Sequence, residues 1–199
     1  MKAIGVILLI LSVVLTVPTS GLLNDQNKLT TWSEYYRIDY FPAYQMIVTN
    51  LIAHQLIEPQ SRPPEAAIPY ALPYLLQREL RGSDGVQVWP DFRRILIIGA
   101  GCGNDVARAL LFTSEYSDLR IDAVEIDPVI QKLGVHYHTD QPYSDPRVHV
   151  TINDGRNFLR QAPDSTYDLI IFALVDSLVL QSGYASLRLE NYLFTLESF

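Results

Sequence analysis

The sequence predicts an α/β protein with an open, parallel, Rossmann-like β-sheet. From Arg94 onward, short apolar segments alternate with segments that suit helices, and glycines or acidic residues directly follow the apolar segments. Residues 95–98 are apolar without interruption, as expected of a parallel strand covered on both faces. Such strand–helix repetition requires right-handed crossovers between neighbouring parallel strands.

The expected elements follow in order along the chain. Strands are expected at residues 95–98, 121–126, 148–152 and 169–174, and helices at residues 68–80, 105–112, 128–133, 155–160 and 187–197. Four strands do not complete a typical doubly wound sheet, and one edge would stay open. We therefore expect the C-terminal strands of the domain to be missing from this chain.

The N-terminal part has a different composition. Residues 3–17 are almost entirely apolar and lie between Lys2 and a run of small residues. This pattern predicts a membrane helix, which could extend through residues 3–23, or alternatively a signal peptide or a buried core helix. A membrane helix would make the protein membrane-associated, with the domain that follows it on the cytoplasmic side.

Residues 24–31 are polar and are interpreted as a connector. An aromatic and apolar region follows at residues 32–58, with a strand expected at residues 36–40 and an ambiguous segment at residues 45–57. We interpret these aromatic residues as core packing, with a membrane-interface belt or a lid over a ligand as alternatives. The chain thus divides into a hydrophobic segment (1–23), a β-rich segment with a linker (24–67) and a Rossmann-like domain (68–199).

Composition limits the classes of partner. The chain has 199 residues, 48% of them hydrophobic, which suffices for one domain with a sizeable core. Its net charge of −7 and the absence of a basic run argue against nucleic acid as a partner. His136 and His138 have no third ligand nearby in the sequence and are interpreted as surface or loop residues, so no metal site is predicted.

The strongest local motif is a glycine loop between the first strand and its helix. It contains Gly99, Ala100, Gly101, Cys102 and Gly103. Glycines allow a sharp turn and close approach of a ligand to the main chain, and the following helix presents unpaired N–H groups. The G-x-G-x-G spacing differs from the G-x-G-x-x-G of dinucleotide-binding sites, which argues against an NAD-dependent oxidoreductase. We expect Cys102 to pack within the loop, with a nucleophilic role as the alternative.

Acidic residues follow the other three strands. Glu125 ends the second strand, where a carboxylate can accept hydrogen bonds from both hydroxyls of a ribose. Asp154 follows the third strand and could accept a hydrogen bond from the exocyclic amine of adenine, or cap the next helix. Asp127 offers the same alternatives. Asp176 follows the fourth strand, and all these positions lie where open α/β sheets bind ligands.

These motifs together resemble the class I S-adenosylmethionine-dependent methyltransferase fold and, within it, the spermidine synthase-like family. The resemblance covers about residues 94–177 and rests on residues 96–101, 124–128, 154–156 and 167–171. It implies a site for S-adenosylmethionine or its decarboxylated form, made by Gly99, Ala100, Gly101, Gly103, Glu125, Ile126, Asp154 and Gly155. It also implies transfer of an aminopropyl or methyl group to an amine or another small acceptor, with a homo-oligomer left open.

Two departures from the family pattern bear on catalysis. Aminopropyltransferases usually carry an acid within the glycine loop and a general-base aspartate after the fourth strand, and these positions correspond here to Cys102 and Ala173. Asp176, three residues further on, is the expected catalytic residue, which would bind or deprotonate an amine acceptor. The alternative is a non-catalytic nucleotide-binding or sensing module of a membrane protein. Gln55 and Tyr184 are further candidates for positions near the substrate.

Overall fold

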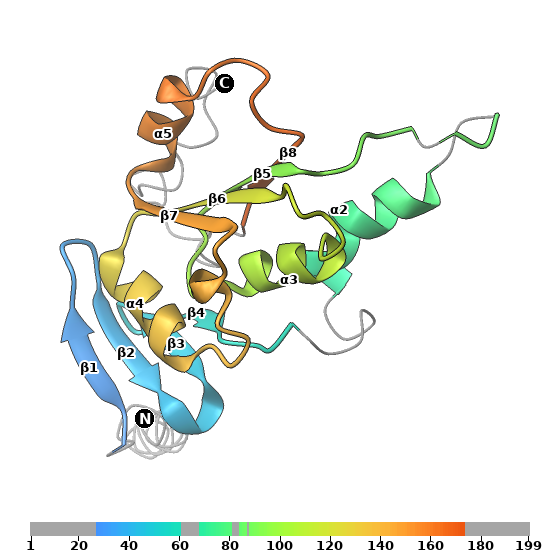
Figure 1. The fold of residues 1–199 in the computed structure, drawn as a ribbon. Coiled ribbons are helices and arrows are strands. Elements are labelled where there is room, and N and C mark those ends of the chain that lie inside the picture. Colours follow the sequence, from blue (N-terminus) through green and yellow to red (C-terminus); the bar gives the residue numbers. More distant parts are fainter. Residues whose placement is uncertain (1–26, 61–67, 81–83, 87, 174–199) are drawn as a thin grey trace, which may run out of the picture.

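The described part of the chain forms two four-stranded β-sheets, one parallel and one antiparallel (Figure 1). We describe a computed structural model, in which residues 27–60, 68–80, 84–86 and 88–173 are described. The parallel sheet has the order β7-β6-β5-β8. Its strands are β5 (Arg94–Ile98), β6 (Arg120–Glu125), β7 (Val148–Ile152) and β8 (Leu169–Phe172). The open α/β fold predicted for this region is confirmed.

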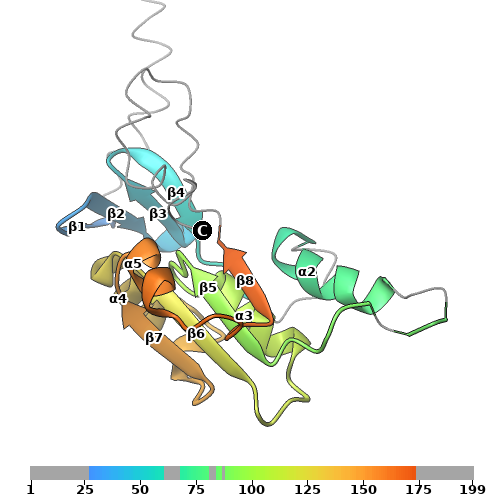
Figure 2. The ribbon, with the colours of Figure 1, turned by 90° about the horizontal axis from the view of Figure 1, so that it is seen from above.

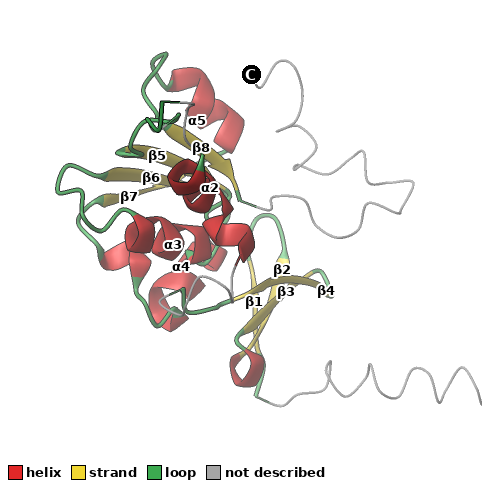
Figure 3. Ribbon diagram, turned by 90° about the vertical axis from the view of Figure 1, so that its right-hand side faces the viewer, coloured by secondary structure: helices red, strands yellow, loops and turns green. Residues whose placement is uncertain are grey.

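Helices cover both faces of the parallel sheet. Helices α3 (Asn104–Phe112) and α4 (Pro128–Tyr137) lie on one face, and α5 (Gly155–Gln161) lies on the other (Figures 1 and 3). The chain moves outward from β5 through β6 to β7 and then crosses back to β8, so right-handed crossovers place α5 opposite α3 and α4. The strand order therefore reverses between β5 and β8, where ligands bind in such sheets.

Apolar side chains from both faces of the central strands form the core. Ile95 and Ile97 pack toward α3, and Leu96 and Ile98 belong to a second cluster with Phe158 of α5. This two-sided burial explains why the sequence of β5 is apolar at every position after Arg94.

The N-terminal sheet is antiparallel, with the order β1-β2-β3-β4. Its strands are β1 (Leu29–Trp32), β2 (Arg37–Phe41), β3 (Met46–Thr49) and β4 (Ile52–Leu56), and a short 3-10 helix η1 (Pro42–Tyr44) joins β2 to β3. The predicted β-rich segment is confirmed, and its ambiguous residues 45–57 form strands. The interpretation of residues 24–31 as a connector is wrong in part, because Leu29 already pairs with Tyr40.

The two sheets share a small core. Ile38, Tyr40 and Ile47 of the antiparallel sheet pack with Cys102 of the glycine loop and Ile130 of α4. The antiparallel sheet lies beside α4 in two perpendicular views (Figures 1 and 2). The interpretation of these aromatic residues as core packing therefore holds for Tyr40 and Phe41, which are buried.

Helix α2 closely matches its expected bounds, whereas helix α4 extends beyond them. Helix α2 (Ile68–Glu79) contains Pro73 and packs on α3, where the ring of Tyr74 stacks on Phe112 at a centroid distance of 5.3 Å. Helix α4 is longer than expected and continues to Tyr137, whose ring lies 4.4 Å from that of Tyr40. This aromatic contact supplies tertiary packing for the last turn, which local sequence signals do not reveal.

The membrane prediction is not tested by these elements. No helix among the described residues is long and apolar enough to cross a bilayer. Residues 1–23, on which the expected membrane helix or signal segment falls, lie outside the described ranges, and so does the helix expected at residues 187–197.

Packing of α4 on the glycine loop gives a first prediction. A Cβ atom on Gly134 would lie 2.5 Å from the backbone oxygen of Cys102 and 2.7 Å from its Cα atom. Alanine is normally about 1 kcal/mol better than glycine within a helix, but relieving such an overlap costs roughly 1–3 kcal/mol. We expect Gly134→Ala to lower the free energy of unfolding in urea titrations.

The exposed neighbour Val135 on the same helix provides the control. Val135→Ala should leave the free energy of unfolding nearly unchanged. Equal or greater stability of Gly134→Ala than of Val135→Ala would show that the helix does not pack tightly on the loop.

Candidate functional site

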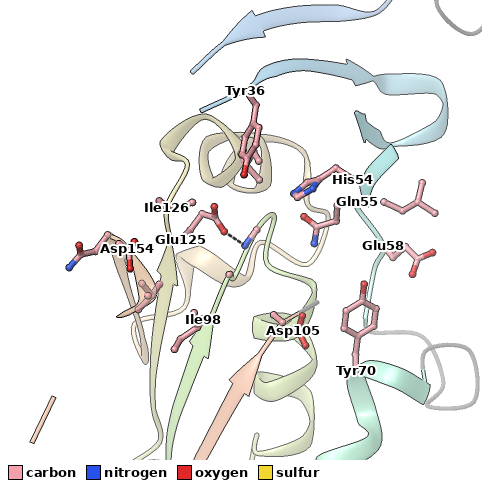
Figure 4. Close-up of a pocket in the computed structure, with 18 residues that line it drawn as sticks. Tyr36, His54, Gln55, Glu58, Tyr70, Ile98, Asp105, Glu125, Ile126 and Asp154 are labelled. Atoms are coloured by element: carbon pink, nitrogen blue, oxygen red, sulfur yellow. Dashed lines mark hydrogen bonds between the residues drawn. The ribbon is translucent and has the colours of Figure 1, made fainter. Parts of the chain in front are cut away.

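A pocket lies at the carboxyl ends of β5, β6 and β7, where the antiparallel sheet approaches the parallel one (Figure 4). Its volume is about 270 Å³, close to the lower end of the range typical of small-molecule sites. The residues that line it are Tyr36, His54, Gln55, Leu56, Glu58, Tyr70, Ile98, Gly99, Gly101, Asp105, Val124, Glu125, Ile126, Ile130, Asn153, Asp154, Gly155 and Ala173.

The glycine loop forms the floor of this pocket between β5 and α3. Gly99, Gly101 and Gly103 have φ angles of 75°, 55° and 97°, a left-handed conformation that side chains with a Cβ atom rarely adopt. The loop is drawn toward β6 because the N–H groups of Gly99 and Ala100 both donate to the carbonyl oxygen of Val124, at 2.8 and 3.0 Å. The sequence therefore needs glycines here for conformation as well as for ligand access.

Glu125 joins the loop to the end of β6. Its carboxylate accepts hydrogen bonds from the N–H of Gly101 at 2.8 Å and from the N–H of Asp127 at 2.9 Å. Burial raises the pKa of Glu125, and these two N–H groups oppose the rise. Each carboxylate oxygen retains a lone pair after accepting one bond, so Glu125 can still accept from the hydroxyls of a ligand in the pocket.

The two aspartates that could act as helix caps differ in their relation to the pocket. Asp127 is buried, accepts from the N–H groups of Val129 and Ile130, and does not line the pocket, so capping of α4 explains it. Asp154 caps α5 through the N–H groups of Arg156 and Asn157, at 2.8 and 3.3 Å, and also lines the pocket. For Asp154, the capping and ligand-binding interpretations therefore coexist.

The structure brings most of the candidate cofactor residues together and separates two of them. Gly99, Gly101, Glu125, Ile126, Asp154 and Gly155 line one pocket. Ala100 instead lies in the main core, and Gly103 precedes α3 and packs against Pro142 and Tyr143. Asp176 and Tyr184 lie outside the described residues.

Of the cysteine and histidine candidates, Cys102 and His138 are buried. The Cys102 thiol is buried and contacts the carbonyl oxygen of Ile130 at 3.4 Å, and burial raises its pKa. A neutral, enclosed thiol is a poor nucleophile, which agrees with the expected packing role. The prediction that His136 and His138 are surface or loop residues holds: His136 is exposed on α4, and His138 lies in the loop after α4, where it is buried and accepts a hydrogen bond from the N–H of Asp140.

The wall opposite β6 comes from the antiparallel sheet and α2, and sequence reasoning identified only Gln55 in it. The Gln55 side chain accepts from the N–H of Cys102 at 3.0 Å. Tyr36, His54, Glu58 and Tyr70 complete this wall. They share no motif, and long-range packing alone places them beside the glycine loop.

Helix α3 holds this wall in place through two buried polar residues. Asn104 donates to the carbonyl oxygen of Leu56 at 2.8 Å and accepts from the N–H of Glu58 at 3.2 Å. Arg108 donates two hydrogen bonds to the Gln60 side chain, at 3.1 and 2.8 Å. The segment after β4 is thereby attached to the same helix that follows the glycine loop.

Asp105 lies between these two residues on α3 and faces the pocket (Figure 4). Burial raises the pKa of Asp105 to about 7, and a hydrogen bond from its own N–H opposes the rise only in part. A carboxyl group with such a pKa changes charge near neutral pH, which is common at functional sites.

The pocket lining is acidic. Glu58, Asp105, Glu125 and Asp154 contribute carboxyl groups, and the described lining residues include neither lysine nor arginine. This charge favours a ligand that carries positive charge. No group of three histidine, cysteine or acidic side chains among the described residues is arranged to hold a metal ion.

The structure defines a Rossmann-like α/β domain with a pocket and an additional antiparallel sheet at the carboxyl end of its parallel strands. A family model for the spermine/spermidine synthase domain matches residues 84–195, more than half of the chain. The protein therefore belongs to the spermine/spermidine synthase domain family.

Individual relatives match a shorter stretch. Spermidine synthase 1 of Pisum sativum is 37% identical over 84 residues, which cover 41% of this chain and 24% of the pea protein. The polyamine aminopropyltransferase of Alkaliphilus oremlandii (strain OhILAs) is 35% identical over 89 residues, 44% of this chain and 30% of that protein. The matches thus span less than a third of these relatives' length.

A solved structure shows the same fold over a larger part of the chain. The crystal structure of a spermidine synthase in complex with the transition-state analogue AdoDATO aligns with a TM-score of 0.58 and 20% sequence identity. The alignment covers 85% of this chain and 51% of that structure. This likeness supports the assignment of the fold.

The buried carboxyl group of Asp105 predicts a pH-dependent stability change. Because its folded-state pKa of about 7 exceeds the ordinary value near 3.9, the folded state favours the neutral form and loses stability as the pH rises between these values. Asp105→Asn should therefore raise the melting temperature, and more so at pH 8 than at pH 5, by roughly 2–4 °C per kcal/mol gained.

Thermal denaturation followed by circular dichroism at both pH values measures this difference. Asp164→Asn, which removes an exposed carboxylate outside the pocket, is the matched control and should change neither melting temperature appreciably. A lower melting temperature of Asp105→Asn at pH 8 would mean that the ionised carboxylate stabilises the fold.

Proposed function

We propose that the protein binds decarboxylated S-adenosylmethionine or S-adenosylmethionine and transfers its aminopropyl or methyl group to a small acceptor, with an amine as the favoured class. Decarboxylated S-adenosylmethionine is a substrate of this family. The observation that carries the proposal is a single pocket that joins the glycine loop to Glu125 and Asp154 and contains no lysine or arginine among its described residues.

The available groups fit the nucleoside part of such a cofactor. Glu125 has lone pairs for ribose hydroxyls, Asp154 can accept a hydrogen bond from the amine of adenine, and Ile126 and Ile130 offer apolar contacts to the base. The acidic lining also suits a positively charged sulfonium. The residues present therefore fit an adenosyl sulfonium ligand better than a nucleotide, whose phosphates would meet four carboxyl groups.

In this proposal the protein contributes mainly by positioning. Bound cofactor supplies an electrophilic carbon beside its sulfur, and the pocket must hold the acceptor in line with the bond that breaks. A protonated amine cannot attack until it loses its proton, so a carboxylate near the acceptor is required. We propose Asp176 for this role, since Ala173, at the position expected for the family's base, is apolar.

A nucleotide-sensing module is the second candidate. It is favoured by the chemistry at two positions, because Cys102 is a buried thiol and Ala173 lines the pocket without a functional group. Formation of any cofactor-dependent product by the purified chain would eliminate this candidate.

Glu125 provides the first test of the proposed function. In Glu125→Gln the side-chain amide cannot accept at both oxygen positions, so the variant loses charge and one hydrogen bond to the loop or to ribose. We expect the affinity for 5′-methylthioadenosine, measured by calorimetric titration, to fall about 10- to 100-fold, as for loss of a charged hydrogen bond. Asp164→Asn should bind as the unaltered protein does, and undiminished binding by Glu125→Gln would refute the ribose assignment.

Asp176 provides a test of catalysis. Asp176→Ala is expected to abolish turnover of decarboxylated S-adenosylmethionine with a diamine, because the acceptor would stay protonated or misplaced. Binding of 5′-methylthioadenosine should survive the substitution. Equal turnover by the two proteins would exclude the role proposed for Asp176.

A further inference from the structure

Four polar residues outside the pocket lining connect three segments of the chain. Gln60 follows β4, Arg108 lies on α3, and His138 and Asp140 follow α4. Gln60, Arg108 and His138 are almost completely buried. Because buried polar groups are costly unless they are hydrogen-bonded, the bonds within this cluster indicate which segments it holds together.

Gln60 is the residue at which the three segments meet. Its backbone N–H donates to the carboxylate of Asp140 at 2.6 Å, and its side-chain oxygen accepts two hydrogen bonds from Arg108. Its side-chain amide donates to the carbonyl oxygen of Glu58 at 3.0 Å. Since Glu58 lines the pocket (Figure 4), the contacts of Gln60 position a residue of the pocket wall.

Asp140 is held in turn by the histidine two residues before it. The N–H of Asp140 donates to Nδ1 of His138 at 3.2 Å. A ring nitrogen that accepts a hydrogen bond carries no proton, so His138 is neutral in this arrangement and its proton lies on Nε2. That Nε2 is buried and has no hydrogen-bond partner among the described residues. The arrangement, which we call closed, therefore requires the neutral ring.

Protonation of His138 would disturb Asp140 in two ways. An N–H on Nδ1 would face the N–H of Asp140, and the charged ring would compete with Gln60 for the Asp140 carboxylate. Burial lowers the pKa of His138, and the charge of Asp140 opposes this only in part. Because the closed arrangement favours the neutral ring, it loses stability relative to an open one as the pH falls through the ordinary histidine value of about 6.5.

The segment after α4 also contacts the glycine loop. It continues into a short 3-10 helix, η3 (Pro142–Ser144). The hydroxyl of Tyr143 in η3 donates to the carbonyl oxygen of Gly101 at 2.8 Å, and Gly101 lines the pocket. A change at His138 and Asp140 would thus act on the wall of the pocket and lies close in the chain to a contact with its floor.

We propose, building on the function proposed above, that Asp140 is a positioning residue for the pocket wall and that protonation of His138 releases it. At neutral pH the Asp140 carboxylate holds Gln60, and with it Glu58, next to α3. In mildly acidic solution the charged ring draws Asp140 away, the segment after β4 loosens, and the adenosyl ligand binds less tightly. Because such coupling is reciprocal, bound ligand stabilises the closed arrangement.

Hydrogen exchange of the Gln60 amide measures the closed arrangement directly, because this N–H donates to Asp140. Exchange in the full chain is followed by NMR at pH 7.5 and pH 5.5, and each rate is corrected for the intrinsic effect of pH on exchange. The test variant is His138→Asn, whose amide oxygen can accept from the N–H of Asp140 but does not titrate. The matched control is His136→Asn, which removes the exposed histidine two residues earlier.

In the unaltered protein and in His136→Asn, protection of the Gln60 amide should fall roughly three- to tenfold between pH 7.5 and pH 5.5, as expected about one pH unit below the histidine value. In His138→Asn it should change less than about twofold. Asp140→Ala should give low protection at both pH values. The amide of Ile97 in β5 reports any general loss of stability. Equal pH dependence in the two histidine variants, or an equal change at Ile97, overturns the inference.

Other titratable groups lie on the elements around His138. Asp105 on α3 changes charge in the same range, since burial raises its pKa to about 7. The exchange series is therefore repeated in Asp105→Asn, where the pH dependence of Gln60 should persist; its disappearance would assign the effect to Asp105 and overturn the inference. Besides Asp140, the remaining groups on these elements are Arg108 on α3, Glu58 after β4, His136 and Tyr137 on α4, and Tyr143 and Asp145 in and after η3.

Titration of the histidine ring by NMR needs no variant. His138 should take up its proton at a lower pH than the ordinary value of about 6.5, and bound 5′-methylthioadenosine should lower that pH further. Protonation of His138 at the ordinary value, with and without the ligand, overturns the inference.

The outcomes separate this inference from the proposed function. Binding of 5′-methylthioadenosine is measured by calorimetric titration at both pH values. If the ligand binds and His138→Asn leaves the pH dependence of Gln60 unchanged, the proposed function stands and this inference fails. If the pH dependence of Gln60 requires His138 but no adenosyl ligand binds, the proposed function fails, and the predicted effect on ligand affinity fails with it.

Discussion

The buried carboxylate of Glu125 is the interaction on which the pocket depends. It accepts from Gly101 in the loop after β5 and from Asp127 in the turn after β6, and thereby ties two neighbouring strand ends together. The next loop N–H, that of Cys102, is satisfied by Gln55 from the antiparallel sheet. The adjacent N–H groups of Gly101 and Cys102 are thus bound by side chains from two different sheets. The hydrogen bond from Cys102 to Gln55 helps to hold the antiparallel sheet over the pocket.

This arrangement concentrates negative charge where water is scarce. Burial raises the pKa values of both Glu125 and Asp105, and only Glu125 receives hydrogen bonds from other residues that offset the effect. Natural proteins retain such unfavourable groups mainly at functional positions. The two residues therefore differ in how far the surrounding backbone uses their carboxylates.

Sequence patterns predicted the parallel sheet well because its information is local. Apolar strand segments alternate with helical segments, a glycine loop follows β5, and acidic residues end β6 and follow β7. Because the carboxyl ends of parallel strands meet at one edge, the approach of Glu125 and Asp154 could be foreseen. Residues 45–57 were ambiguous because Ile47, Val48 and Ile52 suit either a helix face or a strand. Their pairing in a sheet is decided by partners such as Ile38 and Tyr40.

The pocket wall opposite β6 could not be predicted either, because it too depends on long-range contacts. Tyr36 precedes β2, Glu58 follows β4 and Tyr70 lies on α2, and no spacing in the sequence relates them. His138 lies in a loop as predicted, but the sequence did not show that packing of the segment that follows α4 buries it. Long-range contacts decide both cases.

The geometry of α3 explains how one helix both holds the segment after β4 in place and contributes a side chain to the pocket. Asn104 and Arg108 are four residues apart, so they share a helix face, and both bind the segment after β4. Asp105 follows Asn104 by one residue, which turns its side chain by about 100° around the helix axis, away from that segment and toward the cavity. Asn104 and Arg108 therefore hold the segment after β4, while the carboxyl group of Asp105, on the same helical turn, lines the pocket.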